Sequence, residues 1–131
     1  MLQSLKKYFS FDFNKNETDK EIEKIEHKFI LKYQNNDIGY LVFDSNKWFF
    51  EYSDWFKNQN ELELLFEFPE KTKTYNNDSL WPFFKSRIPS EKQPKVQEYY
   101  QENPINRDDL VKLLEVFGMS SINNPYKLYA C

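Results

Sequence analysis

Three short segments rich in apolar residues, separated by short polar turns, dominate the first half of the chain. The segments are HKFILKY at 27–33, IGYLVF at 38–43 and KWFFEY at 47–52. In the first and third segments the side chains alternate between two faces, with the period of two that is expected of a β-strand, and the second also reads as a strand. The clusters QNND and DSNK between them are typical of turns. Because turns this short join strands of opposite direction, the sequence predicts an antiparallel meander.

Each of these strands is expected to carry one apolar face. The residues expected on it are Phe29, Leu31 and Tyr33 in the first segment and Trp48, Phe50 and Tyr52 in the third. A later segment, ELELLFEFPE at 61–70, alternates leucine and phenylalanine with glutamate except at Leu65. It predicts a twisted or edge strand that ends at Pro69, since proline cannot donate to a sheet. The next residues, KTKTYNND at 71–78, are predicted to form a loop.

Helical patterns follow the predicted strands. LWPFFKSR at 80–87 predicts a helix that Asp78 or Ser79 can cap, with Pro82 tolerated in its first turn. SEKQPKVQEYYQEN at 90–103 predicts a second helix, which also has a proline near its start. The last third of the chain is therefore expected to be mainly helical.

A third helix is predicted over INRDDLVKLLEVFG at 105–118, opening at Asn106 and ending at Gly118, which suits a left-handed C-cap. Its apolar stripe consists of Leu110, Leu113, Leu114 and Phe117. Strands first and helices after indicate an α+β domain. We expect one domain over residues 27–131, a small antiparallel β-meander or partial barrel with three helices packed on it. Residues 1–26 are assigned to an N-terminal extension, either a helix or an arm that orders only against something else.

Aromatic residues are unusually abundant and glycine is scarce. The 131 residues include 13 Phe, 9 Tyr and 3 Trp but only 2 Gly. A buried aromatic side chain removes about 150–250 Å² from water, so these residues can build a core and leave some for a partner surface. The net charge of −3 argues against nucleic acid as the main partner, since phosphate binding needs concentrated Lys and Arg. Two glycines cannot supply the common phosphate-binding loops.

Residues that carry catalysis or hold metals are few. His27 is the only histidine and Cys131 the only cysteine, so the sequence contains no paired His or Cys ligands for a metal and cannot form a disulfide within the chain. It also lacks the Gly-x-Ser-x-Gly motif of serine hydrolases. The carboxylates are scattered as surface charge, although a catalytic pair among them remains an open alternative. No apolar run approaches the length of a membrane span, and the chain does not open with a secretory signal. We expect a cytoplasmic protein that is not an enzyme and uses no cofactor and no metal.

The most distinctive segment is SLWPFFKSRIPS at 79–90. Trp81, Phe83 and Phe84 lie within about one helical turn, where successive residues point about 100° apart, so they cannot all face the same core. A surplus aromatic beside Arg87 has the composition of a protein–protein anchor. The alternative, that all three aromatics pack under neighbouring loops, stays open. The next candidates for such an anchor are Trp48 and Trp55, although burial on the sheet or under its first helix is favoured for both.

Several segments, taken in order over residues 27–128, resemble the N-terminal subdomain of HipA-type toxin kinases. In that family a β-rich subdomain precedes a Phe-Phe-x-x-(Arg/Leu)-(Ile/Leu)-Pro pattern, and a Leu-Leu-x-x-(Phe/Ile)-Gly segment comes later. These positions are held here by Phe83, Phe84, Arg87, Ile88, Pro89, Leu113, Leu114, Phe117 and Gly118. The upstream IGYLVFDSNKWFFEYSDWF is similar to the family's strand pair and short helix.

HipA-type kinases continue into nucleotide-binding and catalytic machinery, whereas this sequence stops at Cys131. It thereby resembles the HipS-type small subunits of three-gene HipBST toxin–antitoxin systems. The resemblance implies an antitoxin that binds and neutralises a HipT-like serine/threonine kinase, in a ternary complex with a HipB-like DNA-binding protein. The expected partner-binding residues are Trp81, Phe83, Phe84 and Arg87, docked at the active-site face of the kinase.

Other functions stay open beside this one. A structural adaptor would bridge the kinase and the DNA-binding protein without inhibiting phosphorylation. A small enzyme or ligand-binding domain would show a deep polar pocket. A direct role in nucleic-acid binding ranks last because of the negative net charge.

Overall fold

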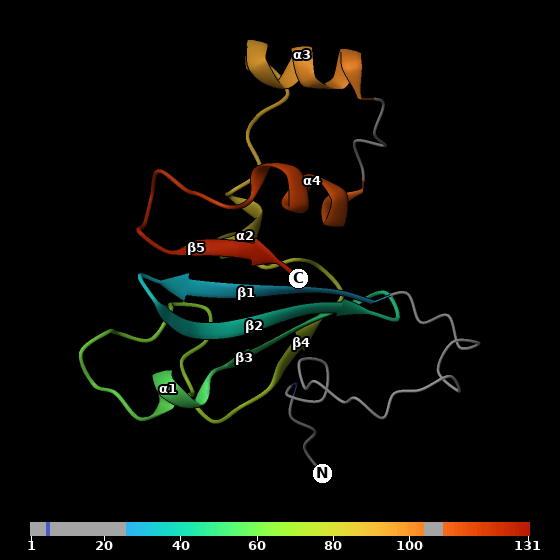
Figure 1. The fold of residues 1–131 in the computed structure, drawn as a ribbon. Helices are drawn as coiled ribbons and strands as arrows, with labels where there is room; N and C mark the ends of the chain where they lie inside the picture. The colour runs from blue at the N-terminus through green and yellow to red at the C-terminus, as the bar shows by residue number, and fades with distance from the viewer. Residues whose placement is uncertain (1–4, 6–25, 104–108) are drawn as a thin grey trace, which may run out of the picture.

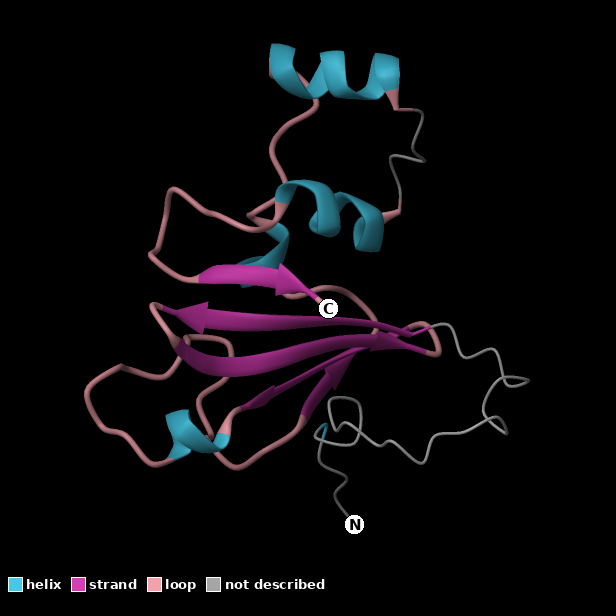
Figure 2. Cartoon of the chain, viewed as in Figure 1, coloured by secondary structure: helices cyan, strands magenta, loops and turns pink. Residues whose placement is uncertain are grey.

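The computed structural model describes residues 5, 26–103 and 109–131 (Figure 1). Within them, antiparallel strands form one sheet in the order β4-β3-β2-β1-β5. The strands are β1 (Glu26–Tyr33), β2 (Asn36–Asp44), β3 (Lys47–Tyr52), β4 (Tyr75–Asn77) and β5 (Lys127–Ala130). The helices are α1 (Asp54–Lys57), α2 (Pro82–Lys85), α3 (Pro94–Glu102) and α4 (Leu110–Phe117). The expected α+β class is confirmed, and in Figure 2 α3 lies farthest from the sheet, with α4 between them.

The predicted meander forms the centre of the sheet. β1 pairs with β2 and β2 with β3, each antiparallel. Ser45 and Asn46, which join β2 to β3, both have positive φ, at 55° and 64°. This is the conformation of the two-residue type I′ turn, whose twist matches the twist of the strands that it joins. Short-range sequence signals therefore located all three strands.

One face of the sheet carries the main core, and the predicted alternation placed it correctly. The core residues of the three central strands are Phe29, Leu31, Ile38, Leu41, Trp48, Phe50 and Tyr52. Gly39 makes room for one of them, because a Cβ at this position would lie only 2.5 Å from Cζ of Phe50. A larger residue in β2 would thus push the Phe50 ring out of a fully buried position.

Both edges of the sheet differ from the prediction. The segment 61–70 forms no strand and folds as an irregular loop. The edge strand is β4 instead, inside the predicted loop, where Tyr75 pairs with Phe50 and Asn77 with Trp48. At the other edge β5, which was not predicted, pairs with β1 and buries Leu128. Strands of three and four residues carry too few side chains to show a period, so only their partners define them.

The helices also depart from the predicted boundaries. α2 is a single turn that begins at Pro82, and Trp81 takes the N-cap position in place of Asp78 or Ser79. The N-cap of α4 is Asp109, whose carboxylate accepts a hydrogen bond from the Lys112 N–H. Asn106, the expected start of this helix, lies outside the described residues.

Gly118 ends α4 without the expected left-handed conformation, because its φ is −85°. The requirement for glycine at this position is steric: a Cβ would lie 2.5 Å from the Leu114 carbonyl oxygen and 2.9 Å from Leu114 Cδ1. The expectation of three helices on the sheet is also corrected, because α3 packs on the far side of α4. Val96 and Tyr100 of α3 form a second small core with Leu113. None of the helices described in Figure 1 has both the length and the apolar character needed to cross a membrane.

One residue from the N-terminal part of the chain contacts the second face of the sheet, at Glu51. Within residues 1–25 the structure describes only Leu5, which is buried. The Leu5 N–H donates a 2.7 Å hydrogen bond to the carboxylate of Glu51, a buried residue of β3. The same carboxylate accepts from the Thr74 hydroxyl and lies 3.6 Å from Lys57 Nζ. At least this residue of the predicted extension therefore belongs to the folded domain.

Candidate protein-binding surface

The start of α2 receives its hydrogen-bond acceptor from a distant loop. The N-cap residue, Trp81, has no side chain that can accept from the first turn of the helix. Glu67 supplies the acceptor instead, since its Oε1 accepts a hydrogen bond of 3.1 Å from the Phe83 N–H. A carboxylate at a helix N-terminus also complements the partial positive charge of the free N–H groups. The loop 61–70 is thereby fastened to the segment that the sequence singled out.

Tyr52 fixes the middle of that loop. Its hydroxyl accepts a 2.8 Å hydrogen bond from the Leu65 N–H and donates one of 2.7 Å to the Phe68 carbonyl. The Phe68 N–H in turn donates to the Leu65 carbonyl over 2.9 Å, which closes a tight turn. Leu65 and Phe68 are buried on either side of it. We call residues 65–68 the Phe66 turn.

Of the three aromatics expected to diverge around α2, one enters the core and two are half-buried. Phe84 is 0% exposed and packs against Phe50, with ring centroids 5.7 Å apart. Trp81 rests edge-on against Phe68, at 5.0 Å, and Phe83 lies 6.2 Å from the ring of Tyr126. Trp81 and Phe83 therefore keep part of their surface exposed to solvent. We name these two residues the α2 surface.

Arg87 is buried, with only 3% of its surface exposed, and serves the chain's own fold. Its two terminal nitrogens donate to the carbonyls of Gly118, Met119 and Tyr126 and to the side chain of Asn124, over 2.9–3.1 Å. Desolvation of the guanidinium lowers its pKa to about 10. The segment after α4 is thus wrapped around a buried cation. Phe84 and Arg87, both expected to contact a partner, lie in the interior of the domain.

The other two tryptophans fall in different environments. Trp48 is buried in the core beside Phe43, as favoured. Trp55 lies on α1 and remains 40% exposed, so the expected burial is wrong for it. The following residue, Phe56, takes the buried position instead and stacks on Tyr52 at 4.4 Å. A helix of one turn can direct only part of its surface to the core, which decides between neighbouring aromatics.

Sequence reasoning missed the most exposed aromatic residue of the loop. Phe66 was expected to alternate with glutamates along a strand, but it sits at the tip of the Phe66 turn with 95% of its surface exposed. Leu64 beside it is also exposed. The available signal was the break at Leu65, where three apolar residues follow one another. Such a run cannot place every side chain on one face of a strand, and here it marks a turn.

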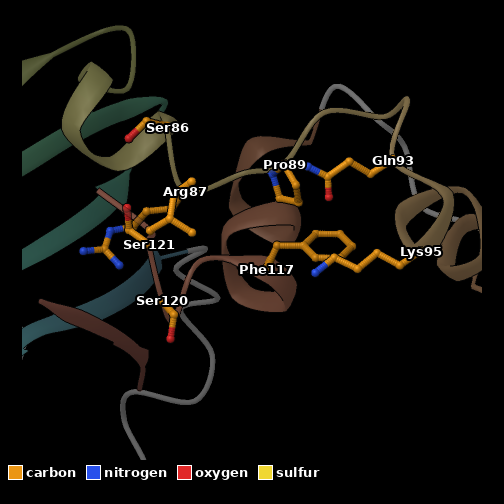
Figure 3. Close-up of a pocket in the computed structure, with 9 residues that line it drawn as sticks. Ser86, Arg87, Pro89, Gln93, Lys95, Phe117, Ser120 and Ser121 are labelled. Atoms are coloured by element: carbon orange, nitrogen blue, oxygen red, sulfur yellow. The ribbon is translucent and has the colours of Figure 1, made fainter. Parts of the chain in front are cut away.

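A cleft of about 390 Å³ lies between the end of α2, the linker to α3 and the segment after α4 (Figure 3). Its lining consists of Ser86, Arg87, Pro89, Gln93, Lys95, Phe117, Ser120, Ser121 and Ile122. This set contains no histidine, cysteine or carboxylate, so within it no side chain can serve as an ordinary general base at neutral pH. Across the described part of the chain, no three His, Cys, Asp or Glu residues gather as a metal site.

Comparison with known proteins agrees with this architecture. The family model described as HipA N-terminal domain matches residues 30–122. Among solved structures, the N-terminal domain of HipA toxin has a similar fold, with a TM-score of 0.56 and 17% sequence identity over 84% of this chain and 97% of that chain. No curated protein matches. The chain therefore belongs to the HipA N-terminal domain family.

Proposed function

We propose that this chain is an antitoxin that binds and neutralises a HipT-like serine/threonine kinase in a tripartite toxin–antitoxin system. Membership of the HipA N-terminal domain family supports a HipA-related role. A domain that packs against a kinase within one chain can do so as a separate chain if the interface overcomes the association entropy, about 4–15 kcal/mol. The complex would form in the bacterial cytoplasm and include a HipB-like DNA-binding protein.

The α2 surface is the observation that carries this proposal. Trp81 and Phe83 stay half-buried although a core of buried aromatics lies directly beneath them. Phe68 and Phe84 support them from below, at 5.0 Å and 5.1 Å between ring centroids. Large aromatic side chains held in place by a packed support are typical hot spots of protein interfaces. In the proposed complex this surface faces the active site of the kinase and blocks or misaligns it.

Co-purification with a HipT-like kinase, followed by a phosphorylation assay, tests the proposal. We expect a stable complex in which phosphorylation of the kinase substrate is lost. Trp81→Ala should weaken binding at least about thirtyfold, the effect of an interface hot spot of about 2 kcal/mol. Ile122→Ala, which removes a fully exposed apolar side chain from the segment after α4, is the control and should bind as the parent does.

The other outcomes of this experiment are equally definite. A complex that forms but still phosphorylates its substrate would replace the antitoxin role by that of an adaptor between kinase and DNA-binding protein. A large fall in the melting temperature of Trp81→Ala would show that Trp81 serves the fold and not the partner. Failure of the parent chain to bind the kinase would refute the proposed function itself.

A further inference from the structure

Phe66 is the most exposed large apolar side chain of the loop 61–70, but exposure alone does not make a binding site. Single apolar residues on a protein surface are common. Where such a residue sits on a segment that is free to change conformation, its ordering on binding costs free energy. What distinguishes Phe66 is the way the backbone on both sides of it is held.

Four hydrogen bonds hold the Phe66 turn. Three of them link Leu65, Phe68 and the buried hydroxyl of Tyr52, at 2.7–2.9 Å. The fourth joins the Glu67 carboxylate to the Phe83 N–H of α2. Phe68 anchors the turn further, because its ring lies 4.2 Å from that of Phe50 in the core. The exposed ring is therefore displayed on a backbone that has already lost its freedom during folding.

The surroundings of Phe66 are acidic. Segment 61–70 contains Glu61, Glu63, Glu67 and Glu70 and neither lysine nor arginine. The first, second and fourth of these glutamates are exposed. Lys71, the next basic residue, points its amine back to the carbonyls of Lys57 and Gln59, at 3.2 Å and 3.4 Å. The apolar ring thus projects from a segment that carries four carboxylates and no basic side chain.

We propose that Phe66 is an anchor that inserts into an apolar pocket of the kinase partner whose rim carries Lys or Arg side chains. This inference rests on the proposed function and extends its surface from α2 to the turn. Phe68 connects the two parts, since it ends the Phe66 turn and supports Trp81. The held backbone lowers the entropic cost of binding, and the glutamates supply electrostatic complementarity and faster association.

Binding of Phe66→Ala to the HipT-like kinase, measured by surface plasmon resonance beside the parent chain, tests this inference. We expect at least a thirtyfold loss of affinity at an unchanged denaturation midpoint, because the side chain contributes almost nothing to the core. Ile122→Ala is the matched control: it truncates a fully exposed apolar residue in the segment after α4 and should change affinity less than twofold. The double variant Glu61→Gln, Glu63→Gln should lower the association rate and flatten its salt dependence.

Each contrary result has a distinct meaning. Affinity of Phe66→Ala within threefold of the parent would overturn the anchor while leaving the proposed function intact. An association rate that the two glutamine substitutions leave unchanged would overturn the basic rim. Sedimentation that shows a dimer of the chain, lost in Phe66→Ala, would assign the ring to a second copy and overturn the kinase as occupant. A parent chain that does not bind the kinase would overturn both proposals together.

Discussion

Replacement of Tyr52 by phenylalanine tests how the Phe66 turn is held. The ring stays in the core, but the hydroxyl that accepts from Leu65 and donates to Phe68 is lost. In the variant, the N–H of the buried residue Leu65 no longer has the Tyr52 hydroxyl as its acceptor. An unsatisfied buried donor costs about 1–3 kcal/mol, so we expect the free energy of unfolding to fall by that amount at pH 7.

The same substitution should show a distinctive pH dependence. Burial raises the pKa of Tyr52 well above its ordinary value of 10.0. An acid whose folded pKa exceeds its unfolded pKa contributes stability that is fully present below pH 10 and is lost as the pH rises further. Parent and Tyr52→Phe should therefore differ by a constant amount up to about pH 9. Their difference should then shrink by about 1.4 kcal/mol at pH 11, because only the parent must keep this phenol protonated to stay folded.

Urea denaturation followed by tryptophan fluorescence, repeated between pH 7 and pH 11, measures both effects. The midpoint should move while the slope stays the same, since the substitution exposes no new surface. Equal midpoints at pH 7 would refute the hydrogen-bond chain through Tyr52. A difference that stays constant up to pH 11 would refute the attribution of the alkaline loss to this phenol.

Two further substitutions probe the interior. Arg87→Met should lower the free energy of unfolding by about 3 kcal/mol, because the carbonyls of Gly118, Met119 and Tyr126 lose a charged donor. Chemical denaturation measures this loss. An unchanged midpoint would mean that the segment after α4 does not depend on the guanidinium. Leu114→Ala should cost about 2–5 kcal/mol, since the side chain is buried in the main core; a parent-like midpoint combined with lost kinase binding would place Leu114 in the interface.

Local patterns in the sequence were sufficient for the central meander and for the leucine stripe of α4. In β1 and β3 the alternation from Phe29 to Leu31 and from Trp48 to Tyr52 matches the buried face. The stripe of α4 was also identified, although the structure divides it, with Leu114 in the main core and Leu113 in the second. These elements can be predicted because each is long enough to repeat its own period at least twice.

The elements that build the candidate surface depended on tertiary structure. Segment 61–70 alternates like a strand, yet burial of Leu65 and Phe68 around the Tyr52 hydroxyl folds it into a turn. Glu67 caps a helix sixteen positions later in the chain, a role that no local pattern encodes.

For the distinctive aromatic segment, the sequence by itself determined that its side chains must diverge, and the fold decided which of them turn inward. Phe84 entered the core, whereas Trp81 remained at the surface. Arg87 has the composition of an interface residue, but the carbonyls of the chain after α4 surround it and take its hydrogen bonds. A residue's neighbours from distant parts of the chain decide whether its polar groups are satisfied inside the domain or left for a partner, and sequence spacing does not carry that information.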